Sequence, residues 1–359
     1  MNVTVITPDE LGATELTAWR AMQEATPALD SPFLSPEFAR AVGHQRPGAR
    51  VAVLSDGQRL LGFFPFERHP FGLGLPIGSG MCDCQGLIHV PGLDWDPMEL
   101  LRACGLRLWR YDHLAEGQTP FETEVAGRAG SPVIDLRQGY DAYLAELRAR
   151  SARRVKHLRH DERALGRRVG EVRFAFHDSD PRSLDALMRH KSAHYRVKEQ
   201  VDLFAQPRAT ALVRELQRAR GATCTGVVSV LYAGGRPVGW LFGLRSRHVL
   251  HIWFSAYDPD VGQFSPGILL RLKAAESAAA EGLDRVDLGK GSEPYKDRLK
   301  TSEFRLSEGW VDRRTIPATV RRAQVEAVTR VRGVVAGSPV LRRAALNTLN
   351  AIPRLGHAG

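Results

Sequence analysis

The sequence contains few cysteines and no long apolar run. Its 359 residues include four cysteines, and none of them forms a Cys-x-x-Cys pair. Cys82 and Cys84 lie too close together for a zinc knuckle or a redox dithiol. No run of ~18 consecutive apolar residues is present, so no membrane-spanning helix is predicted. We therefore expect reduced thiols, no metal site and a soluble chain.

Signals for export and for nucleotide binding are also missing. The first residues lack the basic and apolar regions of a signal peptide, so we expect a cytoplasmic protein. Lys290-Gly291-Ser292 resembles the end of a Walker A motif, but the full pattern Gly-x-x-x-x-Gly-Lys-Ser/Thr is absent and the segment that follows is not clearly helical. Gly72 and Gly74 are followed by Pro76 rather than by a helix, which argues against a dinucleotide site and favours a mobile glycine-rich loop.

The positive charge is concentrated near the end of the sequence. The formal net charge is +10, and residues 311–359 contribute +7 of it through nine arginines and two acids. This segment has two basic amphipathic patterns, at 316–335 and 340–352, separated by a Gly-Ser-Pro break. Their apolar faces hold valine and alanine, so we expect a docked or partly disordered tail that contacts anionic membranes only transiently.

The stretch from Tyr257 to Lys296 carries the strongest chemical signal. Ser265 at the N-cap, Pro266 in the first turn and Gly267 after it predict a helix from about 266 to 281. Alternating apolar residues then predict a short strand at 283–288. A helix that begins with Pro-Gly after a strand exposes backbone N–H groups at the positive end of its dipole, which is suited to binding an anion.

A second pattern is an internal repeat. The hairpin predicted around Asp56-Gly57 matches a later hairpin at an offset of 177 residues, with Val51, Leu54, Gly57, Arg59 and Gly62 opposite Val228, Leu231, Gly234, Arg236 and Gly239. The alternative is that unrelated hairpins share these common residues. We favour duplication.

Ser265-Pro266-Gly267, together with Asp287-Leu288-Gly289-x-Gly291-x-x-x-Tyr295-Lys296, resembles the CelD/BcsL-like branch of the GNAT acyltransferases, relatives of the FemAB peptidyltransferases. The resemblance implies an α/β (α+β) fold of tandem GNAT-like domains with mixed, mostly antiparallel sheets flanked by helices. We expect a degenerate domain at 1–135, a domain with the donor site at 136–310 and a helical tail at 311–359.

The same resemblance implies which residues form the site. The donor, acetyl-CoA or another acyl-CoA, would bind at the helix start through Gln263, Phe264, Ser265, Gly267 and Ile268. Tyr295 would protonate the leaving thiolate, for which a phenol with an ordinary pKa near ~10 is suited, and Glu293 is the nearest general base. The acceptor-side candidates are His194, Arg196, Trp253 and Lys296, with His251 and Trp253 expected on one face of their strand and Ile252 and Phe254 on the other.

A basic helix is predicted at 140–166, where arginines surround an apolar stripe. It could contact CoA phosphates, an anionic glycan or RNA, or it could simply be a solvated face. The sequence therefore favours a CoA-dependent N- or O-acyltransferase acting on a small molecule or glycan, in cell-surface polysaccharide metabolism. Two alternatives remain: a FemAB-like enzyme that uses aminoacyl-tRNA, the only case in which nucleic acid would bind, and a non-catalytic regulator of glycan synthesis.

Overall fold

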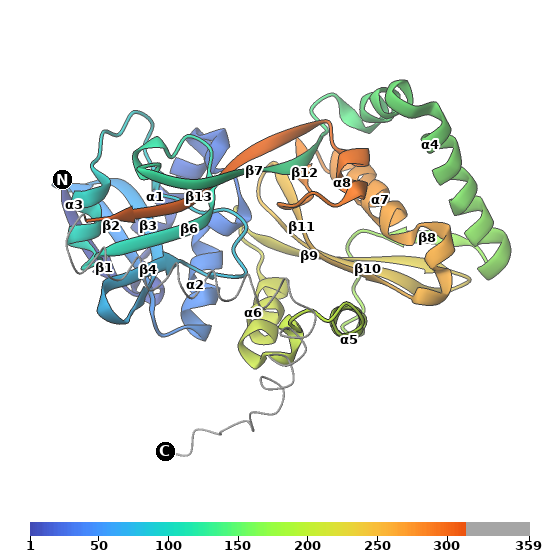
Figure 1. Ribbon diagram of the computed structural model, residues 1–359, viewed down its shortest axis with the longest axis horizontal. Helices are drawn as coiled ribbons and strands as arrows, with labels where there is room; N and C mark the ends of the chain where they lie inside the picture. The colour runs from blue at the N-terminus through green and yellow to red at the C-terminus, as the bar shows by residue number, and fades with distance from the viewer. Residues whose placement is uncertain (314–359) are drawn as a thin grey trace, which may run out of the picture.

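A computed structural model describes residues 1–313, whose strands form one mixed sheet (Figure 1). The strand order is β1-β2-β3-β4-β6-β13-β7-β12-β11-β10-β9-β8, with β5 paired to β3. The strands are β1 (Asn2–Ile6), β2 (Ala49–Asp56), β3 (Arg59–His69), β4 (Leu73–Pro76), β5 (Ile88–His89), β6 (Leu108–Ala115), β7 (Glu124–Asp135), β8 (Val172–Ala175), β9 (Thr225–Ala233), β10 (Arg236–Arg245), β11 (Val249–Tyr257), β12 (Arg285–Asp287) and β13 (Ser302–Asp312).

Helices cover both faces of this sheet. They are α1 (Ala13–Ala25), α2 (Pro36–Gln45), α3 (Pro97–Ala103), α4 (Gly139–Val169), α5 (Arg182–Val197), α6 (Pro207–Arg218), α7 (Pro266–Ala280) and α8 (Pro294–Leu299). In Figure 1, α7 and α8 lie on one side of strands β9 to β11, and α5 and α6 lie on the other. Within residues 1–313, no helix combines the length and the apolar character needed to cross a membrane.

The two halves of the chain repeat one order of elements. The first half runs β1, α1, α2, β2, β3, β4, α3 and β6, and the second runs β8, α5, α6, β9, β10, β11, α7 and β12. In both halves the first strand pairs antiparallel with the hairpin, and the strand after the hairpin pairs parallel with the strand that follows the helix. The predicted tandem GNAT-like architecture is confirmed.

The hairpins match down to their irregularities. The loops are the two-residue turns Gly57-Gln58 and Gly234-Gly235, both flanked by paired residues. In each hairpin the register then skips one residue, Leu61 in β3 and Val238 in β10. These bulges stand 177 positions apart, the same offset as the sequence repeat. A shared bulge is a stronger sign of duplication than a shared turn, because bulges are not demanded by hairpin formation.

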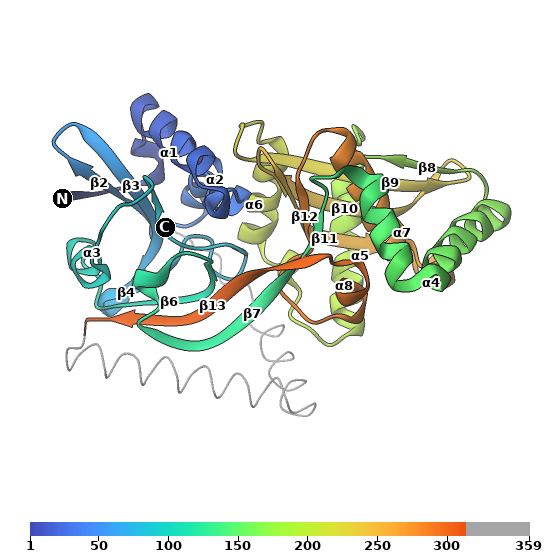
Figure 2. The same ribbon diagram turned by 90° about the horizontal axis from the view of Figure 1, so that it is seen from above.

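The last strands of the two halves are exchanged. β7 from the first half pairs with β12, β13 from the second half pairs with β6, and β7 and β13 pair with each other. Figure 2 shows these two long strands running side by side between the halves. The exchange, which the sequence did not indicate, joins what would be two sheets into one. The domain limits predicted from the sequence stay a prediction.

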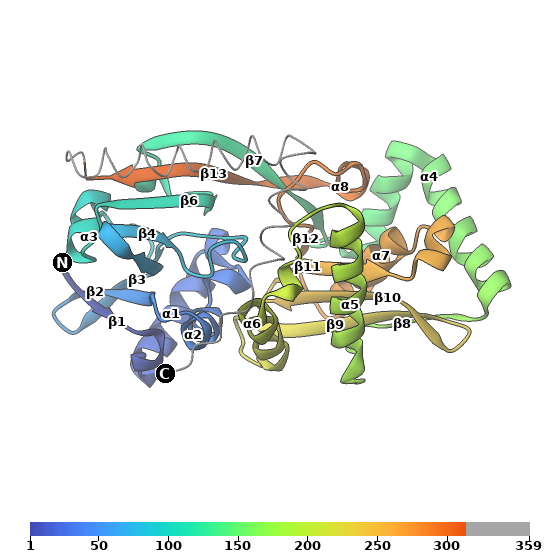
Figure 3. The ribbon, with the colours of Figure 1, turned by 60° about the horizontal axis from the view of Figure 1, so that its bottom comes forward.

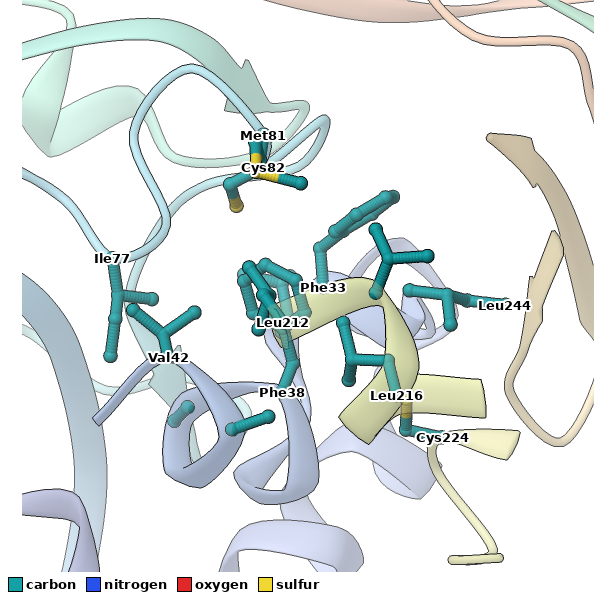
Figure 4. Close-up of a cluster of buried hydrophobic side chains, with 14 of the residues drawn as sticks. Phe33, Phe38, Val42, Ile77, Met81, Cys82, Leu212, Leu216, Cys224 and Leu244 are labelled. Atoms are coloured by element: carbon teal, nitrogen blue, oxygen red, sulfur yellow. The ribbon is translucent and has the colours of Figure 1, made fainter. Parts of the chain in front are cut away.

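A shared apolar core packs the halves together. Side chains of α2 and its flanking turns meet side chains of α6 and the second-half sheet, and Figure 4 shows Phe33, Phe38, Val42, Leu212, Leu216 and Leu244 in this cluster. Cys82 and Cys224 belong to the same cluster, and all four cysteines are buried and unpaired. Burial raises the pKa of Cys224 to about 12, which keeps its thiol protonated and inert.

One sequence expectation was wrong in the first half of the chain. The predicted mobile loop around Gly72 and Gly74 is ordered backbone, with Gly74 inside β4 and paired to both β3 and β6. Glycine is needed there because a Cβ at Gly74 would lie 2.6 Å from the Leu106 side chain. β13 also continues to Asp312, so the strand enters the segment expected to begin the tail. The helices predicted at 316–335 and 340–352 lie outside the described residues.

Phe33 provides a test of the shared core, because its ring contacts both His251 and Trp253 of the second half. Phe33→Ala should lower the free energy of unfolding by about 3–5 kcal/mol, since the side chain is fully buried. Phe71→Ala is the control: that ring is 76% exposed, so the change should stay within about 0.5 kcal/mol. Equal effects of the two substitutions in denaturant unfolding would contradict the shared core.

Candidate functional site

The candidate site begins where β11 and β12 stop pairing. Their parallel ladder joins Val249–His251 to Arg285–Asp287, after which β12 ends while β11 continues to Tyr257. β11 leads through a short 3-10 helix into α7, and β12 leads through the turn 289–291 into α8. The ends of β11, α7 and α8 therefore surround one split in the sheet.

A β-bulge at Trp253 changes which side chains reach each face. Phe242 pairs with Phe254 and Gly243 with Ile252, so Trp253 is skipped in the register. Phe254 consequently joins the face of Trp253, and their rings stack with centroids 4.8 Å apart. The expected alternation of side chains between the two faces of the strand is wrong beyond Ile252. The extra residue of the bulge moves the side chains that follow it to the opposite face. Trp253 itself packs against Phe33 and Phe38 in the shared core rather than standing open for substrate.

The start of α7 matches its prediction in position but not in capping. The helix begins at Pro266, yet Ser265 is in the left-handed region at φ 51° and its side chain caps no backbone N–H. Such a conformation costs a non-glycine residue of order 1–3 kcal/mol and is typical of functional sites. A Cβ at Gly267 would come no closer than 3.5 Å to its neighbours, so protein packing does not require the glycine. The first turn is thus left bare although a side chain would fit.

The other predicted donor-binding residues near the start of α7 differ in how exposed they are. Gln263 is exposed, whereas Phe264 and Ile268 pack partly buried against the apolar core beneath α7. The structure therefore places Ser265 and Gly267 at the open helix end. It places Phe264 and Ile268 at the edge of the core, where they could border a donor without bonding its phosphates.

Arg271 links α7 to β11 and α8. Its side chain is only 9% exposed, and its Nη1 donates to the Gly267 carbonyl at 2.6 Å. Nη2 donates to Ser255 Oγ at 2.9 Å and to Tyr295 Oη at 3.2 Å, and the guanidinium lies 4.2 Å from the centroid of the Tyr295 ring. Tyr295, the predicted acid, is therefore held next to the helix start by a cation that the sequence analysis did not single out.

Glu293 and Lys296 serve mainly to hold the turn after β12. The buried Lys296 ammonium donates to the carbonyls of Gly289 and Lys290, each at 3.0 Å, and pairs with Glu293 at 3.1 Å. These contacts use the three donors of the ammonium. Burial would raise the pKa of Glu293, but hydrogen bonds to its own backbone and to Lys296 lower it overall. A carboxylate with a lowered pKa is a weaker base, and this lysine has no free donor for substrate.

The remaining acceptor-side candidates lie at the end of α5. His194 and Arg196 are both exposed, and Arg196 donates to the Ser192 carbonyl at 3.3 Å. Partial burial and the charges of Lys191 and Lys198 lower the pKa of His194. The imidazole is therefore neutral at pH 7 and could accept a proton, but the structure shows no contact between it and Tyr295.

A buried ion cluster stands at the base of the split. His251 pairs through Nε2 with Asp83 at 3.0 Å and through Nδ1 with Asp287 at 3.4 Å. Asp287 in turn accepts from Ser131 Oγ at 2.5 Å and from the Gly289 backbone at 2.8 Å. Asp83 comes from the first half and the other two charges from the second, so the cluster ties a first-half loop to the last paired residues of β11 and β12.

The pKa shifts define the pH range in which this cluster stabilises the fold. Burial alone would lower the pKa of His251, but Asp287 and Asp83 raise it from 6.5 to about 9. Burial would raise the pKa of Asp287, but His251 and Ser131 lower it from 3.8 to about 2. The His251 contribution is complete below its unfolded pKa and is lost as the pH rises through about 9. The Asp287 contribution is complete above its unfolded pKa and is lost as the pH falls through about 2.

Two adjoining pockets lie on and beneath α4, which forms the outer arm of the second half in Figure 3. The larger has a volume of about 530 Å³ and is lined by Arg148, Ala152, Val155, Lys156, Arg159, Glu162 and Arg163. The helix is interrupted at Ser151, where φ is −163°. The predicted apolar stripe of α4 is buried, so its cations face outward. In the described part of the chain, no cluster of His, Cys, Asp and Glu could hold a metal ion.

Asp287→Asn tests the ion cluster. It should lower the free energy of unfolding by about 3–5 kcal/mol at pH 6, because a buried imidazolium loses one of its two carboxylates. The loss should shrink at pH 10, where His251 of the unchanged protein is itself neutral. Asp284→Asn, which breaks the exposed pair with His248, should cost less than about 1 kcal/mol at either pH. If unfolding in guanidinium chloride shows the same loss of unfolding free energy for Asp287→Asn at both pH values, the assignment of the ion cluster is contradicted.

Comparison with solved structures agrees with this architecture. FemX superposes with a TM-score of 0.58 at 10% identity, over 87% of this chain and 97% of that chain. A conserved protein of unknown function from Bacteroides thetaiotaomicron gives 0.56 at 9% identity, over 87% and 100%. The C-terminal domain of a protein named as a lysylphosphatidylglycerol synthetase, from Agrobacterium fabrum, gives 0.51 at 12% identity, over 86% and 97%. At these identities the likeness shows the fold alone.

Sequence comparison finds a matching domain family for the second half of the chain. No curated protein matches the chain significantly. Residues 136–297, which run from the end of β7 into α8 and include the helix start, Arg271 and Tyr295, match the model of the acetyltransferase (GNAT) domain. This region is similar to the acetyltransferase (GNAT) domain, and the fold of the chain is similar to that of FemX.

Proposed function

We propose that this protein is an acyltransferase that takes its acyl group from an acyl-CoA, with acetyl-CoA as the simplest donor. The observation that carries the proposal is the open start of α7, where Ser265 does not cap the helix and Gly267 adds no side chain. Pro266 has no N–H and the N–H of Ile268 already donates to the Ser265 carbonyl at 2.9 Å, so the N–H of Gly267 and the helix dipole are the features that favour a phosphate there. Arg271, beside the same turn, adds a positive charge.

The corresponding helix of the first half supports this assignment by contrast. α3 begins at Asp96, whose carboxylate accepts from the backbone N–H of Met98 at 2.6 Å and of Glu99 at 2.9 Å. A built-in anion therefore occupies the position that α7 leaves open. The duplication supplies two helix starts of the same topology, and only that of the second half is suited to an external phosphate.

Transfer needs an acceptor nucleophile, a stabilised tetrahedral intermediate and a proton for the leaving thiolate. The acceptor attacks the thioester carbon and loses its proton to solvent water, the C–S bond breaks, and Tyr295 gives its phenolic proton to the CoA thiolate and regains one from solvent. Arg271 holds the Tyr295 hydroxyl and stabilises negative charge that develops beside it. The acceptor is an amine or hydroxyl of a small molecule or glycan, and we place the reaction in the cytoplasm, in cell-surface polysaccharide metabolism.

A second candidate donor is aminoacyl-tRNA, and one observation favours it. α4 presents a pocket of about 530 Å³ lined by four cations and a single carboxylate, which suits the phosphates of a nucleic acid. Binding of tRNA that weakens steeply with salt, without heat from acetyl-CoA in calorimetry, would identify this donor. A protein that binds neither would instead be a non-catalytic regulator with the same fold.

Gly267→Val should weaken acetyl-CoA binding at least about tenfold, which is ~1.4 kcal/mol, because the branched side chain covers the backbone N–H groups. The fold should survive, since a Cβ meets only ordinary contacts at this position. Calorimetric titration of a folded variant measures the change. Gly262→Val, in the preceding 3-10 helix, is the control, and equal losses in the two variants would contradict the site.

Tyr295→Phe should leave acetyl-CoA affinity within about twofold while lowering kcat about 10²-fold or more, because only the proton donor is removed. The ring and its contact with Arg271 are kept. Steady-state kinetics over a pH range, once an acceptor is known, separates the two effects. A variant with the kcat of the unchanged enzyme at every pH would remove Tyr295 from the acid role.

A further inference from the structure

A pocket lies between the two halves, at the end of the sheet where β11 and β12 begin. One wall comes from α1 and the turn after it, and the other comes from the β10–β11 turn and the start of β12. Its volume is about 190 Å³. A single water needs about 10–15 Å³ of such space, so the pocket can hold a small organic molecule. The proposed donor site lies past the other end of β11, whose nine residues span roughly 25 Å.

Gln23 lines this pocket with an unpartnered acceptor. The residue is only 1% exposed, and its Nε2 donates to the carbonyls of Leu29 and Ser31, each at 3.1 Å. These two bonds fix the orientation of the amide, because the flipped amide would set its oxygen against two carbonyl oxygens. Oε1 has no hydrogen-bond partner within residues 1–313. Buried side-chain acceptors are nearly always paired in folded proteins, so this oxygen calls for a donor.

Asp30 lines the same pocket and has the same deficit. The residue is 7% exposed, and its Oδ2 has no hydrogen-bond partner in the part of the chain that the structure describes. The nearest cation, Arg285, donates from Nη2 to the backbone carbonyl of Asp30 at 3.1 Å rather than to the carboxylate. A buried carboxylate without a donor costs free energy, because it loses water and gains nothing in exchange.

Arg285 is the cation of this pocket that is left for a ligand. The other charged side chains of the lining already have ion partners: Arg20 pairs with Glu37, Arg247 with Glu24, and His248 with Asp284. Among residues 1–313, no ion pair occupies Arg285, and its bonds to the carbonyls of Asp30 and Pro27 both use Nη2. The rest of its guanidinium fork therefore remains available.

We propose that this pocket binds a small zwitterion, a molecule with one ammonium group and one carboxylate, of which an α-amino acid is the simplest kind. The ammonium supplies the donors that Asp30 and Gln23 lack. The carboxylate meets the free part of the Arg285 guanidinium, whose planar fork suits an acid group. Binding is non-covalent and joins a residue of the second half to two of the first.

The balance of charge favours a zwitterion over a simple ion. The lining carries three arginines and three acids, so a plain cation would meet guanidinium groups and a plain anion would meet the unpaired carboxylate of Asp30. Asp30 and Arg285 also border a small cavity beside His251 and Asp287. The ligand would therefore contact the support of the proposed acyl-transfer site and not the site itself, and this inference stands apart from that proposed function.

A panel of the common α-amino acids tests the pocket in the unchanged full-length protein. At least one of them should raise the Tm, because a ligand that binds only the folded state stabilises it, and calorimetry then gives its Kd. The methyl ester of that amino acid lacks the carboxylate, and its N-acetyl derivative lacks the ammonium. Each should bind at least about tenfold more weakly, since one charged contact is lost. A derivative that binds as tightly as the amino acid, or a panel without any effect, would overturn the proposal.

Asp30→Asn locates the ligand in this pocket. It should weaken binding of the amino acid at least about tenfold, yet without ligand it should be as stable as the unchanged protein or more so, because a buried uncompensated charge is removed. Asp56→Asn is the matched control, since it removes the same charge from an exposed hairpin of the first half. Unchanged affinity in Asp30→Asn, or equal losses in the two variants, would contradict the site.

Coenzyme A separates this pocket from the proposed donor site. A saturating concentration should not displace the amino acid, because the two sites lie at opposite ends of β11. Competition between them would place the amino acid in the donor site and overturn the second pocket. If coenzyme A does not bind at all, the proposed donor is wrong, while Asp30→Asn still decides whether the zwitterion pocket exists. If Asp30→Asn does not fold, the ester and the N-acetyl derivative decide on the unchanged protein.

Discussion

The end of pairing between β11 and β12 is the constraint on which the site depends. Past His251 and Asp287 the two strands diverge, and their backbone groups no longer satisfy each other. The divergence is held open by interactions on both sides of it. The ion cluster of Asp83, His251 and Asp287 fixes its base, and Lys296 fixes the turn that leaves β12. A bare helix start and a phenol can then face each other without a strand between them.

Duplication explains why the first half stabilises the site of the second half without having an open helix start of its own. Both halves place a helix after a parallel-paired strand, but in the first half the helix start is capped by Asp96 and the neighbouring space is filled by an aromatic cluster that includes Trp109, Phe64 and Phe121. The first half instead contributes Asp83 and Phe33 to the surroundings of His251. Together with the exchange of β7 and β13, these contacts make the second half dependent on the first.

The sequence predicted the features that depend on a few neighbouring residues. Ser-Pro-Gly correctly marked the start of α7, and the paired glycine turns correctly marked two related hairpins, because caps and turns depend on a few adjacent residues. It could not predict the contact of Asp83 with His251, since 168 residues separate them. It also missed Arg271, which was one cation in an apolar helical pattern. The bulge at Trp253 was missed because an extra residue in a strand leaves no mark in apolar alternation.

The central claim is that the start of α7 receives the phosphates of the acyl donor. Amide hydrogen exchange or amide chemical shifts of the whole protein, with and without acetyl-CoA, locate the bound donor residue by residue. The account predicts the largest change at the backbone N–H of Gly267, and none at Met98 and Glu99, where Asp96 already caps the helix. Changes confined to α4 or to α3, with none at the start of α7, would contradict it.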